Sequence, residues 1–149
     1  MVSYTLIEII NSIFNGGKEM KETTTVKVVT ADPSALGLFG LAIITLVASS
    51  QKLGFTEGTA LLLPWAIFLG ASAQLVACIN DFKHNNTFGA TAFGAYAFFW
   101  FAMAFAWLVQ GGVFGPTLAQ QADTKQLGVV FFGYLIQKLH NHKKILKIL

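Results

Sequence analysis

The sequence contains little charge. Acidic and basic residues make up 11% of its 149 positions, every one of the ten cations is a lysine, and the formal net charge is +3. Soluble domains carry about 25% charged residues, so this composition favours a membrane protein. Without arginine the chain lacks the side chain that best contacts phosphate, which argues against nucleic-acid binding. One cysteine, and glycines without a triplet repeat, exclude disulfide-stapled and collagen-like proteins.

The sequence also lacks the common signatures of catalysis. It has no G-x-S-x-G or H-E-x-x-H run, no phosphate-binding glycine loop and no pair of carboxylates at a working spacing. Cys78 lies inside an apolar stretch and is interpreted as a small packing residue. The histidines at 84, 140 and 142 are interpreted as solvated loop and tail residues. The sequence therefore predicts no enzyme, no cofactor and no metal site.

Long uncharged stretches are what the chain does contain. A spanning helix needs about 20 mostly apolar residues to cross about 30 Å of hydrocarbon. Hydropathy and charge predict such helices at about 33–51, 59–80 and 87–110, the last ending at a turn-rich run over 111–116. None of them shows the polar stripe of a water-facing helix. The predicted fold class is all-α, a polytopic membrane helical bundle with three complete transmembrane helices.

A fourth segment is only partly apolar. The apolar part covers 127–136 and would rise about 16 Å as a helix, roughly half of the hydrocarbon thickness. We therefore expect a partial fourth helix that either bends out of the membrane at its basic end or lies in the interface. The chain then divides into an N-terminal cytoplasmic tail over 1–31, whose apolar residues 2–14 suit an interfacial helix, a membrane domain over 32–137 and a basic tail over 138–149.

Lysines in the short loops predict the orientation. The tail before Asp32 and the loop over 81–86 together hold four lysines, whereas the loops over 52–58 and 111–126 hold two. Loops rich in lysine tend to stay on the cytoplasmic side. We therefore expect a multi-pass protein of the inner (plasma) membrane with a cytoplasmic N-terminus. The basic C-terminal tail lies on that side only if the fourth segment crosses the membrane.

The start of the first span is a well-formed helix N-terminus. Asp32 can accept hydrogen bonds from free amides of the first turn, and Pro33 suits the first helical position because it has no amide to leave unpaired. One interpretation is a capped helix with small residues for close packing. The other is a positive helix end that faces a route for anions.

The second and third spans carry polar residues among small ones. Thr87 and Thr91 follow one another on one row of the third helix, and Tyr96 lies on the neighbouring row. Such a strip permits close helix packing or lines a water-filled route. On the second span Gln74 is an amide that must find partners across helices or in water, and both roles stay open for it.

These runs together resemble the signatures of the acetate uptake transporter family, the succinate/acetate permeases. The run from Asp32 to Leu38 is similar to the family's first-helix signature, and Ala73-Gln74 to its second-helix element. The run from Asn86 to Phe93, followed by Tyr96 and Trp100, resembles its third-helix signature. The resemblance covers about 31–136. It implies six helices per subunit, a homo-oligomer that is a hexamer, and a route in each subunit for acetate and other small carboxylates.

The resemblance also implies where the substrate passes. Leu41 falls where the family often has a phenylalanine in a hydrophobic constriction, and Tyr96 falls on its aromatic partner. The chain departs from the family's pattern at Asp32, where asparagine is common, and at Ala35, where a second proline is common. The expected substrate-pathway residues are Asp32, Pro33, Leu36, Gly37, Leu41, Gln74, Asn86, Thr87, Phe88, Thr91 and Tyr96.

The chain holds three and a half of the six helices that the resemblance implies. The leading hypothesis is a truncated member, the N-terminal half of a transporter subunit, which moves acetate and related carboxylates only as an oligomer or with a companion fragment. A channel and a proton-linked transporter fit the sequence equally. The alternative is a non-transporting integral membrane remnant, or a helix-association protein.

Overall fold

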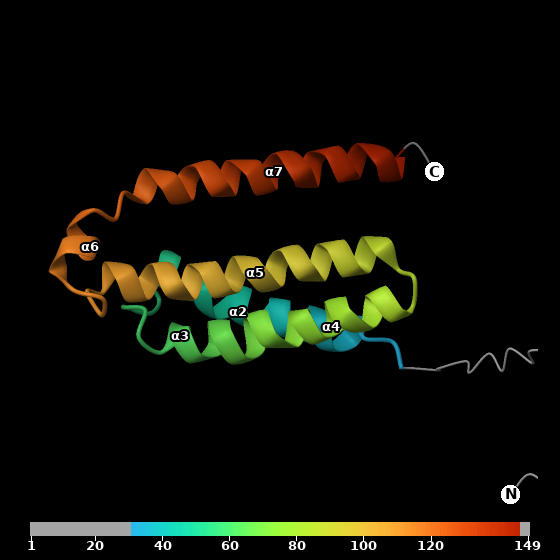
Figure 1. Ribbon diagram of the computed structural model, residues 1–149, viewed down its shortest axis with the longest axis horizontal. Coiled ribbons are helices and arrows are strands. Elements are labelled where there is room, and N and C mark those ends of the chain that lie inside the picture. The colour runs from blue at the N-terminus through green and yellow to red at the C-terminus, as the bar shows by residue number, and fades with distance from the viewer. Residues whose placement is uncertain (1–30, 147–149) are drawn as a thin grey trace, which may run out of the picture.

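The computed structural model describes residues 31–146, and every regular element in that range is a helix. The expected interfacial helix over 2–14 lies outside the described residues. The chain runs through five helices and two shorter helical pieces (Figure 1). They are α2 (Ser34–Lys52), α3 (Leu62–Pro64), η1 (Trp65–Ala71), α4 (Ser72–Lys83), α5 (Thr87–Gln110), α6 (Pro116–Gln120) and α7 (Thr124–Leu146).

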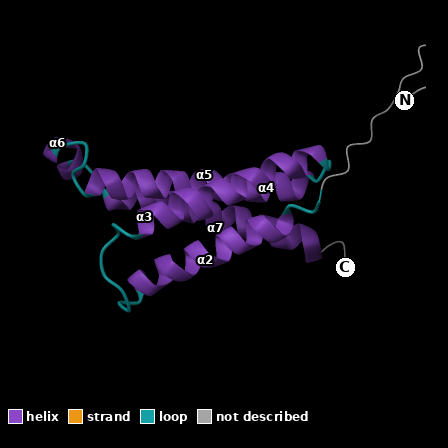
Figure 2. Cartoon of the chain, turned by 90° about the horizontal axis from the view of Figure 1, so that it is seen from below, coloured by secondary structure: helices purple, strands orange, loops and turns teal. Residues whose placement is uncertain are grey.

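Three helical segments among the described residues are long and apolar enough to cross a membrane. They cover Ser34–Lys52, Leu62–Lys83 and Thr87–Gln110, with mean hydropathies of 1.6, 1.9 and 1.7. These ranges confirm the three predicted spans to within a few residues at each end. Figure 2 shows that α2 runs at an angle to α4 and α5, which lie closely side by side.

The second spanning segment contains a π-helical stretch, which hydropathy does not predict. Here α3, η1 and α4 follow one another without a break, and Pro64 stands immediately before η1. Pro64 lies in the first turn of this segment, where the amide that proline lacks would have no partner within the helix, so its presence costs no helical hydrogen bond. The Ser72 hydroxyl donates to the carbonyl of Ile67, five residues back, at 2.8 Å. Such π turns often mark functional positions in helices.

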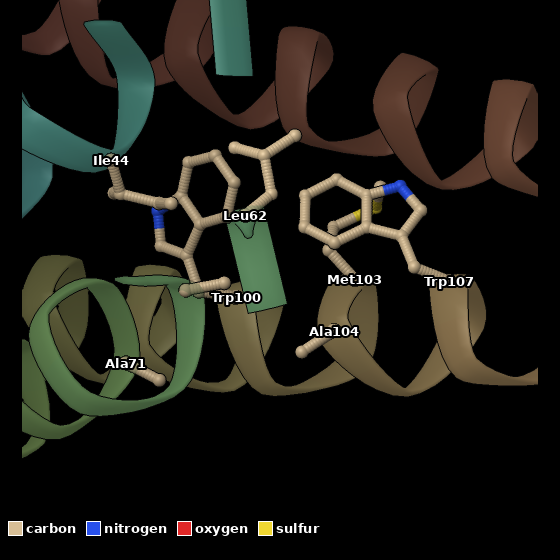
Figure 3. Close-up of a cluster of buried hydrophobic side chains, with 8 residues drawn as sticks. Ile44, Leu62, Ala71, Trp100, Met103, Ala104 and Trp107 are labelled. Atoms are coloured by element: carbon tan, nitrogen blue, oxygen red, sulfur yellow. The ribbon is translucent and has the colours of Figure 1, made fainter. Parts of the chain in front are cut away.

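Glycines let the first two rods approach closely. A Cβ added to Gly40 would lie 2.7 Å from the carbonyl oxygen of Leu69, and one added to Gly70 would lie 3.0 Å from Ile44. The main chains therefore touch where only glycine fits. Around this contact lies the core of the bundle (Figure 3), with buried residues Ile44, Leu62, Ala66, Ala71, Trp100, Met103, Ala104 and Trp107.

The fourth helix differs from the expectation. α7 runs unbroken from Thr124 to Leu146, past Gln137, and lies alongside α5 without bending away (Figure 1). The predicted bend at its basic end is therefore wrong. Lysine and leucine are both good helix formers, so a loss of hydropathy does not by itself end a helix. Among the described helices α7 is not apolar enough to count as a complete span, which agrees with three complete spans and a partial fourth.

Aromatic side chains join α7 to the bundle. The Tyr134 hydroxyl donates to the carbonyl of Ala95 on α5 at 2.8 Å. The Tyr134 ring lies 5.1 Å from Phe99 and 6.0 Å from Tyr96, centroid to centroid, and Phe131 lies 5.8 Å from Phe99. Large side chains hold the two helices apart, so a groove opens beside them.

Candidate functional site

The start of α2 meets the expectation in part: Asp32 accepts a hydrogen bond from the first turn, but Pro33 is the N-cap residue and not the first helical residue. The Ser34 amide donates to Oδ1 of Asp32 at 2.9 Å. Pro33 is buried and stands one residue before the helix, and the Gly37 amide donates to its carbonyl at 3.2 Å. The hydrogen bonds from Ser34 hold the pKa of Asp32 below its ordinary value. The entrance to α2 therefore carries an exposed negative charge next to the positive end of the helix.

Gly37 ties this signature to the third span. A Cβ on Gly37 would lie 2.5 Å from the ring of Phe93, so α2 and α5 meet at a position where a side chain does not fit. Leu36 on α2 is 45% exposed. Leu41, further along the same helix, is half-buried.

A buried carboxylate, which is not among the predicted pathway residues, organises the turn between α4 and α5. Asp81 is 1% exposed, and its Oδ1 accepts from Nδ2 of Asn86 at 3.1 Å. Asn86 caps α5, because its side-chain oxygen accepts from the Gly89 amide at 3.0 Å. Gly89 packs against Oδ2 of Asp81 so closely that a Cβ has no room. We call these three residues the Asp81 cluster.

The sequence does contain a pattern that indicates this cluster. Asp81 comes five residues before Asn86, which caps the third span, and Gly89 comes three residues after Asn86. A carboxylate on the preceding helix and an N-cap amide meet when the intervening turn is tight. Asn85 makes the turn tight because it adopts a left-handed conformation, with φ of 56°.

Gln74 lies deep inside the bundle. Its side chain is fully buried, and Nε2 donates to the carbonyl of Gly70 in the same rod at 2.7 Å. Its Oε1 has no hydrogen-bond partner within the described residues, and neither has Nε1 of Trp100. The side-chain amide of Gln74 therefore bonds only within its own helix. A buried acceptor without a hydrogen bond costs free energy, and a donor that reached Oε1 would remove this cost.

The threonine row on α5 is satisfied within its own helix. The Thr91 hydroxyl donates to the carbonyl of Thr87 at 2.8 Å, and both residues are exposed. Phe88, on the neighbouring row, is 63% exposed. Tyr96 is half-buried, with its ring 6.5 Å from that of Phe99. The predicted pathway residues therefore separate into a group at one end of the bundle and the mid-helix aromatic group around Tyr96.

A cavity of about 400 Å³ continues from this aromatic group along α2, α5 and α7. Its lining begins at Thr45 on α2, one turn beyond Leu41, and at Phe99 on α5, just beyond Tyr96. The Thr45 hydroxyl faces its own helix, where it donates to the carbonyls of Leu41 and Ala42. The cavity is consequently lined almost wholly by carbon. Among the side chains that the structure describes, no three from His, Cys, Asp or Glu come together as a metal site.

The fold and these features define a polytopic helical membrane protein with closely packed glycine-rich spans. The sequence profile of the GPR1/FUN34/yaaH family matches residues 14–141. The chain belongs to this family, the acetate uptake transporters.

Similar proteins include transporters of small carboxylates. The chain is 36% identical over 73 residues to the succinate-acetate/proton symporter SatP of Escherichia coli strain K12, covering 49% of this chain and 39% of that protein. It is 37% identical over 84 residues to acetate permease A of Emericella nidulans, covering 55% and 28%. The solved structure of the bacterial acetate channel SatP matches with a TM-score of 0.61 at 29% identity, over 72% of this chain and 56% of that one. The chain spans about half the length of that channel, and less of the other two.

Proposed function

We propose that this chain takes part in moving acetate and related small carboxylates across a membrane. The observation that carries the proposal is the match of its fold, over 72% of the chain and at 29% identity, to the bacterial acetate channel SatP. The signature residues support it. Asp32 accepts a hydrogen bond from the first turn of α2, Asn86 caps α5, and the starts of these two helices lie at the same end of the bundle (Figure 1).

The substrate route proposed here passes from that end toward Leu41 and Tyr96. Neither side chain supplies a positive charge, so a carboxylate that passes between them loses its water without gaining a counter-charge. An unpaired ion pays a large free-energy cost in apolar surroundings, and the protonated acid pays much less. A narrow apolar passage of this kind favours the neutral acid, or an anion that keeps part of its water.

Conduction is proposed to need assembly into a homo-oligomer, with a hexamer as the expected form. The support is the large apolar surface that one chain exposes. Leu38, Phe39 and Leu46 on α2, Phe68 on η1 and Val129 on α7 are each more than half exposed. Helices in a membrane associate through such packing and through small residues at the interface.

The proposed location is the inner membrane with a cytoplasmic N-terminus. The lysine count over the loops supports this orientation. The course of α7 adds support, because its lysine-rich end lies at the same end of the bundle as the start of α2 and the α4–α5 turn (Figure 1). If that end is cytoplasmic, the basic residues gather on one side.

Labelled acetate uptake tests the proposal. Purified chain in proteoliposomes should take up acetate, and Tyr96→Ala should change the rate, whereas Tyr96→Phe, which keeps the ring, should change it less. Phe98→Ala is the matched control, because Phe98 is a 64% exposed aromatic on the same helix. Uptake that ignores Tyr96→Ala would remove Tyr96 from the route.

A cross-linking experiment separates the alternative. If the chain assembles into a defined oligomer but liposomes that contain it take up no more acetate than empty ones, it is a helix-association protein and the transport proposal fails. Uptake that rises with the assembled fraction supports transport by the oligomer.

A further inference from the structure

Two side chains of α4 hold the π-helical stretch η1 in place. The amide and the hydroxyl of Ser72 both donate to the carbonyl of Ile67, five residues back. Nε2 of Gln74 donates to the carbonyl of Gly70 at 2.7 Å. Both acceptor carbonyls belong to η1, whose turns are wider than those of an α-helix. We call Ser72 and Gln74 the η1 clamp.

The first span rests directly on the stretch that the η1 clamp holds. A Cβ added to Gly40 of α2 would lie 2.7 Å from the carbonyl oxygen of Leu69. A Cβ added to Gly70 would lie 3.0 Å from the side chain of Ile44. Packed interiors transmit such close contacts with little slack. Because Leu41 lies between these two contacts on α2, its position follows the shape of η1.

The third span rests on the same stretch. Ala66 and Ala71 of η1 are buried in one cluster with Trp100 of α5, and Figure 3 shows Ala71 and Trp100. Trp100 follows Tyr96 by four residues, about one helical turn. Leu41 and Tyr96, between which the proposed acetate route passes, therefore both belong to helices that pack on η1.

Gln74 itself is out of reach of a molecule that passes along this route. Its side chain is fully buried, and its Oε1 accepts no hydrogen bond from the described residues. A molecule that bound Oε1 would first have to separate α4 from the helices packed on it. What the side chain contributes is its donor, which holds the carbonyl of Gly70.

We propose that Ser72 and Gln74 are positioning residues. By holding η1 in its wide form they set the separation of Leu41 and Tyr96, and with it the size of the carboxylate that passes. Neither residue contacts the substrate. The effect on substrate size rests on the proposed function, whereas the clamp on η1 does not.

Amide hydrogen exchange tests the clamp without any transport. Gln74→Leu should speed exchange in the peptide that contains η1 about fivefold, the factor for loss of one hydrogen bond. Ser72→Ala, a smaller change, should act in the same direction. Asn80→Leu is the matched control, because Nδ2 of Asn80 also donates to a carbonyl four residues back, that of Val76, away from η1. Unchanged exchange in a folded Gln74→Leu chain would overturn the clamp.

The ratio of acetate to propionate uptake tests the positioning role. Propionate is one methylene longer, a difference that an apolar passage distinguishes about tenfold. Gln74→Leu should remove most of this preference and Asn80→Leu should keep it. A loss of folded protein lowers both rates and leaves their ratio unchanged. A wild-type ratio near one, or a ratio that Gln74→Leu does not alter, would overturn the proposal.

A double variant separates positioning from direct contact with the substrate. If Gln74 acts through Leu41, Gln74→Leu should change the ratio little once Leu41→Ala has widened the passage. Additive changes would mean that Gln74 touches the substrate, and the positioning role would fail. A wild-type chain without acetate uptake would contradict the proposed function alone, and hydrogen exchange would still decide whether the clamp exists.

Discussion

Removing the Asn86 side chain should destabilise the bundle far more than removing another asparagine side chain of the same helix pair. Asn86→Ala deletes two hydrogen bonds: the cap on the Gly89 amide at 3.0 Å and the bond to Oδ1 of Asp81 at 3.1 Å. Loss of an N-cap costs about 0.5–2 kcal/mol. Leaving a buried acceptor without its donor costs about 1–3 kcal/mol. The expected loss of unfolding free energy is the sum, about 1.5–5 kcal/mol.

Asn80→Ala provides the control for this prediction. Its Nδ2 donates only to the carbonyl of Val76 in the same helix, at 2.9 Å and with access to solvent. That substitution should cost less than about 1 kcal/mol. Both variants are unfolded with denaturant in mixed micelles and followed by far-ultraviolet circular dichroism. If Asn86→Ala costs no more than Asn80→Ala, the Asp81 cluster does not hold the α4–α5 turn together.

A double-mutant cycle separates the cap from the buried pair. Asp81→Ala removes the carboxylate that Asn86 satisfies. When Asp81 is already absent, Asn86→Ala should cost only the cap, about 0.5–2 kcal/mol. The losses of unfolding free energy in the two single variants should therefore add up to more than the loss in the double variant, as expected for residues in direct contact. Additive losses would show that the 3.1 Å contact carries no coupling energy.

Three further predictions follow from the packing, the α2 cap and the topology. Gly40→Ala should cost about 1–3 kcal/mol, because its Cβ meets a main-chain carbonyl at 2.7 Å that cannot move aside, whereas Gly128→Ala, in open space on α7, should be neutral or stabilising in the same unfolding assay. The lowered pKa of Asp32 means that its contribution to stability is full above the ordinary aspartate pKa of about 3.9 and is lost as the pH falls through the lower folded value. Asp32→Asn should remove that part of the acid loss, seen as a smaller fall in melting temperature, and an unchanged acid profile would contradict it. For the topology, Asn85→Cys and Thr56→Cys should react with a membrane-impermeant thiol reagent from opposite sides of the membrane, and labelling of both from one side would refute the three-span arrangement.

The charge of Asp32 affects the approach of an anion to the start of α2, where the proposed acetate route begins. The carboxylate is exposed and engaged with the amide of Ser34, so it offsets part of the positive end of α2. An asparagine there would keep the hydrogen bond without the charge. Asp32→Asn should therefore raise the initial rate of acetate uptake if the route begins at this end, most strongly at low ionic strength, where charges are least screened.

The sequence by itself determined the three spans and the cap at Asp32. Hydropathy is a property of composition within about 20 residues, and an N-cap involves residues two or three apart, so both can be read without knowledge of distant contacts. The family signatures are local runs for the same reason. These features carry the membrane class and the acetate hypothesis.

Only the tertiary structure decided the rest. The burial of Asp81 against Gly89 and the burial of Gln74 both depend on how α4 packs against α5, which the sequence does not reveal. It kept α7 straight past Gln137, where falling hydropathy had suggested a bend, because helix propensity and apolarity are separate properties of a residue. It also formed the apolar groove between α2, α5 and α7, because the residues that line it, from Thr45 to Phe131, come together only through packing.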